Sequence, residues 1–420
     1  MIETDLAVIG GGPAGLAAAI EARRNGVRNV TIIERDREPG GILQQCIHSG
    51  FGLHIMKEEL TGPEYADRFI RQAGQLGIDF RLNTMALGIS PNREVSIVNS
   101  YDGATAIKAG AVILAMGCRE RTRGALNIPG TRPAGIYTAG TAQRLVNMDG
   151  YLPGKNIVIL GSGDIGLIMA RRLTLEGATV KMVCELMPYS SGLTRNIVQC
   201  LHDYDIPLAL NHTVVGIHGT ERLEGVTVAQ VDTERRPIPG TNRYIECDTL
   251  LLSVGLIPEN ELTRTAGIEM DSATGGPAVN ESMETSLEGV FACGNVVHVH
   301  DLVDNVSRES MLAGRCAAQY IAGQRGKNKD ARVIFTVAGN DVSYVVPQRI
   351  RSEYVQSESK LFFRVKREFR QAKAVIRSNG ETIYTKNLLR AVPGEMESIA
   401  ISSDLLGRVK GRDIVISMER

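Results

Sequence analysis

The sequence lacks the patterns that mark a disulfide framework, a cysteine-bound metal or a membrane-spanning helix. Its seven cysteines form no C-x-x-C pair, which argues against a disulfide scaffold, a thiolate metal site and an iron–sulfur cluster. This usage fits a reducing cytoplasm, the location we expect. No apolar run approaches the roughly 20 residues that cross a bilayer, and the N-terminus has no signal-peptide pattern. The formal net charge of +0 gives no indication of nucleic-acid or anionic-membrane binding.

What the chain does contain is ordinary globular material. It has 420 residues, of which 43% are hydrophobic and 22% charged. At about 150 residues per domain, this length predicts two to four domains with sizeable cores.

A glycine-rich stretch near the N-terminus is the most informative part of the chain. An apolar run at residues 7–9 enters Gly10, Gly12 and Gly15 at G-x-G-x-x-G spacing, and a helix-forming run follows. Gly10 permits a tight turn, Gly12 lets the backbone approach a pyrophosphate, and Gly15 lets the helix pack close to the strand. A second apolar strand ends at Glu34, which can accept hydrogen bonds from a ribose diol. The free amides and the positive helix end then predict a dinucleotide site.

The same unit occurs a second time. An apolar run at residues 157–160 leads into Gly161, Gly163 and Gly166, and the next strand ends at Glu185. The acid lies 24 positions after the first glycine in both copies. Two copies with equal internal spacing predict two bound dinucleotides. A terminal acid favours a free ribose 2′-hydroxyl and would repel a 2′-phosphate, so we expect NAD rather than NADP at the nicotinamide copy.

The rest of the chain predicts an α/β fold followed by a β module. Proline and glycine punctuation at residues 119–155 is typical of a crossing linker. An apolar strand at 289–293 precedes a helix expected at about 307–322. A polar linker at 323–330 leads to short alternating runs, with Asn379-Gly380 as a hairpin turn. These runs predict an all-β, sandwich-like module at 331–420.

From residue 1 to about 325 the chain resembles the two-dinucleotide-binding-domain flavoproteins, the superfamily of glutathione and thioredoxin reductases. The first glycine unit matches that family's FAD site, and the second matches its nicotinamide site. Residues 115–117 (Ala-Met-Gly) match its Ala-Thr-Gly motif. Gly294-Asn295 match its late Gly-Asp motif, although Asn295 cannot supply the charge of the acid that holds the ribityl chain. Val306-Ser307 match the start of the helix whose N-terminus points at the flavin pyrimidine.

The resemblance implies two sets of cofactor-binding residues. The FAD set is Gly10, Gly12, Pro13, Ala14, Gly15, Glu34, Arg35, Gly41, Ile42, Ala115, Gly117, Gly294, Asn295, Val306 and Ser307. The NAD(H) set is Gly161, Gly163, Asp164, Gly166, Glu185 and Gly255.

The redox cysteine pair of the disulfide reductases is missing. Leu43 and His48 occupy the positions of the C-x-x-x-x-C pair, and Cys46 lies between them, out of register. A dithiol relay to a disulfide is therefore not expected.

More closely, the runs at 40–48, 57–65 and 293–301 look like a bacterial subgroup. Its members resemble the NAD-linked flavoprotein subunits that accompany flavin-dependent glycerol-3-phosphate dehydrogenases. More distant relatives are the α-type subunits of sarcosine oxidase, opine oxidase and cyanide synthase. Many of these carry a cysteine-rich iron–sulfur module at the C-terminus, whereas residues 331–420 contain no cysteine. Any such cluster would have to be on another chain.

Two side chains are the catalytic candidates, each with an alternative. Cys46 is either a flavin-side redox thiol or a buried small hydrophobe. His48 is either a proton donor or an ordinary loop histidine. His298, His300 and Asp301 suggest a metal triad, but a role in lining the flavin pocket is favoured and no metal is expected.

The sequence thus predicts an FAD-dependent NAD(H) oxidoreductase with two Rossmann-like domains, the second inserted in the first. FAD is expected on residues 1–120 and 286–330, and NAD(H) on 121–285. The module at 331–420 would contact a partner or a second copy. The expected partner is a second flavoprotein dehydrogenase subunit, with a small iron–sulfur protein as a further candidate. The alternatives are a self-sufficient NADH oxidase and a non-catalytic, redox-sensing dinucleotide-binding subunit.

Overall fold

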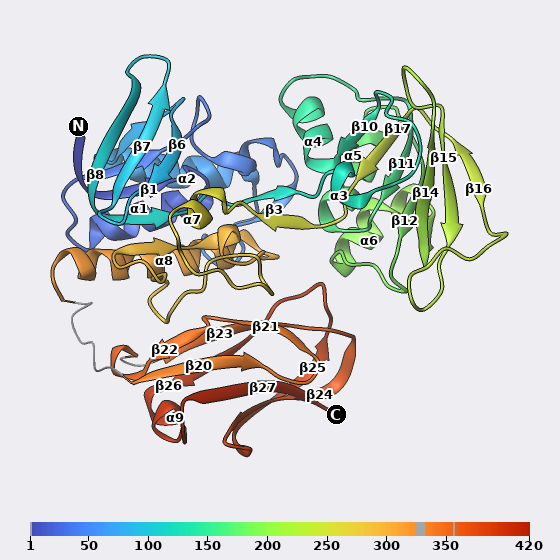
Figure 1. Ribbon diagram of the computed structural model, residues 1–420. Helices are drawn as coiled ribbons and strands as arrows, with labels where there is room; N and C mark the ends of the chain where they lie inside the picture. Colours follow the sequence, from blue (N-terminus) through green and yellow to red (C-terminus); the bar gives the residue numbers. More distant parts are fainter. Residues whose placement is uncertain (1, 325–331, 356–357) are drawn as a thin grey trace. The chain divides into compact units, whose positions relative to one another are not determined.

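The protein forms two compact units. The computed structural model describes residues 2–324, 332–355 and 358–420 (Figure 1). The first unit comprises Met1–Gln44, Ser49–Cys118 and Pro258–Arg420, and the second comprises Gln45–His48 and Arg119–Ile257. Most of the polar linker expected at 323–330 lies outside the described residues. Across the described ranges, no helix combines the length and apolar character needed to cross a membrane.

The first unit is built on a seven-stranded sheet with the order β5-β2-β1-β8-β7-β6, in which β19 also pairs with β8. Strands β1, β2, β5, β8 and β19 are mutually parallel, whereas β6 and β7 are antiparallel. The strands are β1 (Ile2–Ile9), β2 (Val30–Ile33), β5 (Asp79–Arg81), β6 (Met85–Ile89), β7 (Glu94–Asn99), β8 (Gly103–Leu114) and β19 (Val290–Ala292). The helices are α1 (Pro13–Arg24), α2 (Gly62–Gln75), α7 (Glu261–Thr265) and α8 (Val303–Ile321), with the small pair β3 (Ser49–Phe51) and β4 (Leu60–Thr61).

Strand β8 changes partners along its length. Its first half pairs with β7, and its last residues pair with β19, while β1 lies along its other edge. The all-apolar end of β8, which the sequence predicts to be buried on both faces, is fully buried. The last residues of β1, β2, β8 and β19 pair with one another, so these parallel strands end at the same edge of the sheet, where the first glycine turn follows β1.

Helices α1 and α8 pack side by side (Figure 1). A Cβ on Gly314 of α8 would lie 2.1 Å from the carbonyl oxygen of Ala18, so only glycine allows this approach. The alanine-rich face of α1 is buried throughout.

The second unit repeats the parallel arrangement. Its five-stranded sheet has the order β10-β17-β11-β12-β13 and is parallel throughout. The strands are β10 (Ile136–Thr138), β11 (Asn156–Leu160), β12 (Thr179–Glu185), β13 (Leu208–Leu210) and β17 (Thr249–Leu252). Helices α4 (Ala139–Asn147), α5 (Asp164–Leu175) and α6 (Thr194–Cys200) accompany them. A second, antiparallel sheet contains β14 (His212–His218), β15 (Gly225–Gln230) and β16 (Arg243–Glu246).

The linker predicted at residues 119–155 was wrong. This stretch contains α3 (Arg123–Leu126), strand β10, which pairs with β17, and the nine-residue helix α4. The Thr138 side chain caps α4 by accepting a hydrogen bond from the Thr141 amide. The glycines and prolines around α4 resemble those of a linker. The helix is stabilised by burying Ala139 and Ala142 against the sheet, which the local sequence does not indicate.

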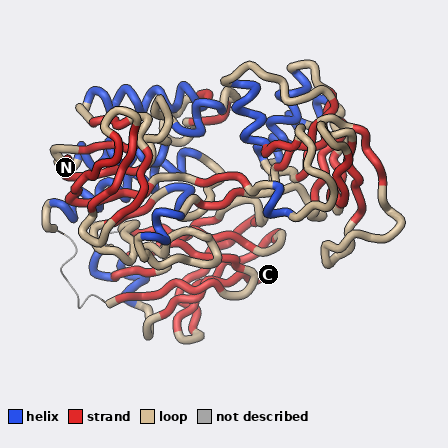
Figure 2. Tube along the Cα trace, turned by 45° about the horizontal axis from the view of Figure 1, so that its top comes forward, coloured by secondary structure: helices blue, strands red, loops and turns tan. Residues whose placement is uncertain are grey.

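The C-terminal module is a two-sheet β structure, as predicted. Figure 2 shows that strands are its main elements. One sheet has the order β22-β20-β27-β24-β25 and the other β21-β23-β26. The strands are β20 (Val333–Ala338), β21 (Val342–Val346), β22 (Arg349–Arg351), β23 (Glu358–Val365), β24 (Phe369–Ser378), β25 (Glu381–Ala391), β26 (Glu397–Ser402) and β27 (Asp413–Glu419), with α9 (Ser403–Gly407) between the last two. Asn379 and Gly380, both at positive φ, form the hairpin turn between β24 and β25.

The second unit ends at Ile257, whereas the sequence placed the end of the NAD(H) domain at 285. The intervening segment packs in the first unit, where Ile268 and Met283 belong to the main core and other residues contact the C-terminal module. The Gln348 amide donates to the Val279 carbonyl, and the Arg351 guanidinium binds Glu281 Oε1 at 3.0 Å. Nothing in the sequence marked these contacts.

Candidate functional site

The first glycine turn has the geometry that its spacing predicts. Gly10 is at φ +106°, and a Cβ there would lie 2.4 Å from the Ala115 carbonyl oxygen. A Cβ on Gly15 would lie 1.8 Å from the Gly10 carbonyl oxygen. A Cβ on Gly12 would meet only the Gly41 Cα, at 3.9 Å. The space in front of Gly12 is therefore open, as the cradle of a pyrophosphate requires. Pro13 and Ala14 begin α1 directly after it.

The loop at Gly40-Gly41 closes over this turn. The Gly40 amide donates to the Gly11 carbonyl, and Gly41 at φ +54° lies against Gly12. Ile42, on the same loop, is 58% exposed. The structure therefore brings this loop and the Ala115–Gly117 motif to the turn.

Each glycine unit holds its terminal acid in the same way. Glu34 accepts hydrogen bonds from the amides of Gly11 and Asp36, at 2.6 and 2.8 Å. Glu185 accepts from the amides of Ser162 and Met187, at 3.0 and 2.9 Å. Both acids are buried, and each joins its strand end to its glycine turn. Arg35, next to Glu34, forms an ion pair with Glu259 near the surface.

The second glycine turn contacts a residue that the sequence did not single out. A Cβ on Gly161 would lie 2.0 Å from the Ser253 carbonyl oxygen, and the Gly166 amide donates to Ser253 Oγ at 3.1 Å. Asp164 was expected to bind cofactor, but its Oδ1 accepts from the Leu193 amide and from Asn196. The Asp164 side chain thus ties α6 to α5. Only its position after the apolar strand β17 could have marked Ser253.

The expected start of the flavin-facing helix was four residues late. Helix α8 begins at Val303, and Ser307 lies within it, where Ser307 Oγ and Tyr65 Oη share a buried hydrogen bond of 2.9 Å. Val306 packs close to Gly294, where an added Cβ would lie 3.2 Å from it. Asn295 accepts from the His300 amide through Oδ1, so its side chain holds the loop after β19.

Cys46 and His48 belong to the second unit, where Cys46 Sγ contacts Gln143 Oε1 of α4 at 3.7 Å. Burial raises the pKa of the Cys46 thiol to about 12, so the thiolate form needed by a redox nucleophile is disfavoured at neutral pH. Burial, together with the positive charges of Arg195 and Arg171, lowers the pKa of His48 to about 4. At neutral pH His48 is therefore an uncharged imidazole.

His48 predicts a specific loss of stability in acid. Its ordinary pKa is 6.5 and its folded value about 4, so between these the unfolded chain binds more protons. The contribution of His48 to the free energy of unfolding is complete above pH 6.5. It falls as the pH drops toward 4, by up to about 3 kcal/mol. When the unfolding free energy from urea titrations is plotted against pH, His48→Gln should show a shallower slope between pH 4 and 6.5 than the wild type. The exposed control His202→Gln should match the wild type. An unchanged slope in His48→Gln would contradict the assignment.

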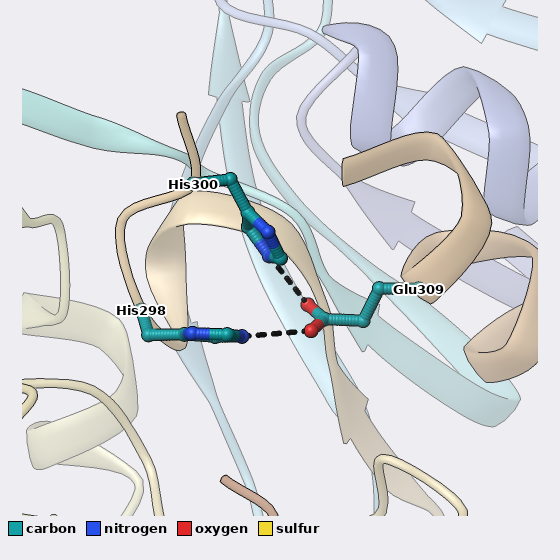
Figure 3. A group of neighbouring side chains, drawn as sticks. All are labelled: His298, His300 and Glu309. Atoms are coloured by element: carbon teal, nitrogen blue, oxygen red, sulfur yellow. Dashed lines mark hydrogen bonds and ion pairs between the residues drawn. The ribbon is translucent and has the colours of Figure 1, made fainter. Parts of the chain in front are cut away.

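A second buried cluster lies at the end of β19, where the sequence suggested His298, His300 and Asp301. The structure brings Glu309 of α8, not Asp301, to the two histidines (Figure 3). His298 Nε2 lies 2.8 Å from Glu309 Oε2, and His300 Nε2 lies 3.3 Å from Oε1. Burial alone would raise the pKa of Glu309, but His300 and His298 outweigh it and hold that pKa well below its usual range. Asp301 instead binds Arg364.

Glu309 could have been found only as an acid on the buried face of α8. Residues 306, 310, 313 and 317 of that face are small or apolar and buried, and Glu309 lies among them. A buried acid needs a partner, and two histidines lie 9 and 11 positions upstream of Glu309.

The match to a family model identifies the family to which the protein belongs. The model described as "Pyridine nucleotide-disulphide oxidoreductase" matches residues 4–319. The chain belongs to this family. Members of the pyridine nucleotide-disulphide oxidoreductase family are FAD-dependent NAD(P)H oxidoreductases, and the protein is one of them. The open cradle at Gly12 fits the FAD pyrophosphate.

The relatives within this family include components of larger enzymes. The HcnB component of hydrogen cyanide synthase from Pseudomonas protegens is 27% identical over 344 residues, which are 76% of this chain and 70% of that protein. One of the subunits of opine oxidase from Agrobacterium tumefaciens is 25% identical, and the match covers 69% of this chain and 61% of that protein. Among solved structures, the thioredoxin reductase of T. acidophilum shares the fold with a TM-score of 0.63 at 23% identity, covering 76% of this chain and 99% of that one.

Proposed function

We propose that this protein transfers electrons between NAD(H) and a partner redox protein, as one subunit of a flavoprotein dehydrogenase complex. One observation carries the proposal: two complete dinucleotide units occur in a chain whose sequence contains neither a C-x-x-C nor a C-x-x-x-x-C pair. The chain has the parts for hydride exchange between two cofactors but no such cysteine pair to pass electrons to a disulfide.

The residues of the chain have binding and orienting roles in this proposal. The amides after Gly10 and Gly161 would hold the two pyrophosphates. Glu34 and Glu185 would each accept from a ribose hydroxyl with the lone pairs that the protein leaves available. Bound FAD supplies a two-electron centre that can take a hydride from a nicotinamide and release electrons to another acceptor. Hydride transfer needs no acid or base from the protein, so the buried states of Cys46 and His48 are no obstacle.

The partner is proposed from the relatives. Two of them are named as enzyme subunits, one of hydrogen cyanide synthase and one of opine oxidase. By analogy, this chain would serve as a subunit of a larger enzyme. The further proposal, that this enzyme is a dehydrogenase acting on a small hydroxy substrate such as glycerol 3-phosphate, rests on the sequence resemblance of the runs at 40–48, 57–65 and 293–301. An iron–sulfur carrier, if one takes part, would be a separate chain.

We also propose NAD rather than NADP as the nicotinamide cofactor, because Glu185 is a buried acid at the end of β12. A 2′-phosphate near this carboxylate would meet like-charge repulsion.

The test uses the purified full-length chain under anaerobic conditions. We expect NADH to bleach the bound flavin stoichiometrically, and to do so at least about tenfold more efficiently than NADPH, or about 1.4 kcal/mol. Turnover should be fast with an artificial electron acceptor and slow with oxygen. Glu185→Gln should reduce the preference for NADH over NADPH, measured as the ratio of the efficiencies with which the two nucleotides reduce the flavin.

Each alternative has its own result in this test. Rapid NADH consumption with oxygen, abolished in Cys46→Ser, would establish a self-sufficient oxidase in place of electron transfer to a partner. If neither NADH nor NADPH bleaches the flavin, the protein would instead be a redox-sensing binding component. Any preference for NADPH would overturn the role given to Glu185.

A further inference from the structure

We propose that His298, His300 and Glu309 bind one divalent transition-metal ion, with zinc as the representative. The site lies in the first unit, between the loop that follows β19 and helix α8 (Figure 3). The proposal does not depend on the partner or on the direction of electron flow.

The spacing of the three side chains fits a metal ion. Their ligand atoms all lie within 4.8 Å of one another. In a tetrahedral site with bonds of about 2.0–2.1 Å, ligand atoms are about 3.3 Å apart. The contact of His298 with Glu309 Oε2, at 2.8 Å, and that of His300 with Glu309 Oε1, at 3.3 Å, are close to that separation, although each imidazole faces a different carboxylate oxygen. An ion could therefore replace the proton that the carboxylate and an imidazole share, with only small side-chain movements.

His300 supplies a second observation. Its side chain is 0% exposed, and within the described part of the chain neither ring nitrogen makes a well-formed hydrogen bond. Burying a polar ring without such a bond costs roughly 1–3 kcal/mol. A bond from the metal ion to Nε2 would give the His300 ring a partner on the side that already faces Glu309.

The supporting groups hold these ligands in position. The Gly294 amide donates to Glu309 Oε1 at 2.8 Å and fixes the carboxylate. The Phe362 ring lies 5.7 Å from the His298 ring and 6.1 Å from the His300 ring. An apolar neighbour of this kind excludes water and strengthens ligand binding to the ion.

Three protein ligands leave a fourth position open, as in catalytic rather than structural zinc sites. Glu309 and Phe362 line a cavity of about 440 Å³ between α8 and the C-terminal module. Neither histidine lines this cavity, so a water or a small ligand would approach the open position from the side of Glu309 and Phe362. The donor set of two imidazoles and one carboxylate favours zinc and neighbouring transition metals over calcium or magnesium, which prefer all-oxygen sites.

The experiment measures metal in the full-length holoenzyme. The protein is loaded with Zn²⁺, passed over a weak chelating resin, and analysed by elemental mass spectrometry together with its FAD content. We expect about one zinc per chain in the wild type. His300→Phe keeps a ring but removes both nitrogen atoms, and should lose at least about tenfold in zinc affinity. Glu309→Gln should do the same, and the exposed control His202→Phe should retain the metal.

The outcomes separate clearly. A normal FAD content with no zinc in His300→Phe supports the site. Wild-type protein without zinc, or zinc that persists in both site variants, overturns it. Co²⁺ added to the wild type provides a measurement that needs no variant to fold. Visible bands of tetrahedral cobalt are expected, and their absence would also refute the proposal.

Discussion

Gly15→Ala is expected to abolish tight FAD binding. The new Cβ would lie 1.8 Å from the Gly10 carbonyl oxygen and 3.0 Å from its carbon. Both are backbone atoms of the same turn, so no flexible side chain can move aside. Relief requires α1 to withdraw from β1, which displaces the amides that face the pyrophosphate. Overpacking costs about 1–3 kcal/mol, so FAD affinity should fall about 10- to 100-fold, as measured by titrating apoprotein with FAD.

Two glycine variants provide the comparison. Gly74 is an exposed residue of α2, and a Cβ there meets nothing within 4 Å, so Gly74→Ala should leave FAD affinity unchanged. Gly166→Ala places its Cβ 2.7 Å from Ser253 Cβ in the second unit, and should slow reduction by NADH while sparing FAD. If Gly15→Ala bound FAD like Gly74→Ala, the close approach at the first turn would be refuted.

Arg364→Met is expected to destabilise the first unit by about 3–5 kcal/mol, the usual effect of removing one partner of a buried pair. The Arg364 side chain is 16% exposed and pairs with Asp301. It also donates to the Tyr344 hydroxyl and to the carbonyls of Val299 and Pro393. These bonds join the C-terminal module to the loop after β19. Methionine fills the space but leaves the Asp301 charge without its partner.

The exposed pair Arg370–Glu368 supplies the control, because its arginine is 81% exposed. Arg370→Met should change the unfolding free energy by about 0–1 kcal/mol. Adding Asp301→Asn to Arg364→Met should recover part of the loss, because it removes the uncompensated charge. Urea titration followed by circular dichroism measures all three variants, and equal midpoints for Arg364→Met and Arg370→Met would contradict the role of Arg364.

The glycine units could be predicted because their information is local. Gly10, Gly12 and Gly15 each meet a steric demand of one turn, and the spacing to Glu34 follows from the length of one strand–helix–strand unit. The alternating strands of the C-terminal module could be recognised for the same reason. Their period of two and the Asn379-Gly380 turn are short-range features.

The elements that were missed depend on contacts distant in sequence. Helix α4 was concealed because its glycine- and proline-rich neighbourhood resembles a linker, and only packing on the sheet reveals it. The assignment of Cys46 to the second unit depends on Gln143, 97 residues away. Glu309 completes a cluster with two histidines that the sequence paired with Asp301. Only the buried face of α8, on which Glu309 lies, could have indicated which of the two acids turns inward.

The packing of α1 against α8 has a consequence for how the protein is made. A ribosome releases α1 first, yet the glycine-bearing face of α8 that covers it is encoded about 280 residues later, after the whole second unit. At about 5–20 residues per second, the apolar side of α1 waits about 15–60 s for its cover. During that interval the inserted unit can fold while the first sheet still lacks β19. The apolar surface of the nascent chain is therefore open to aggregation or to chaperones until the last third of the chain emerges.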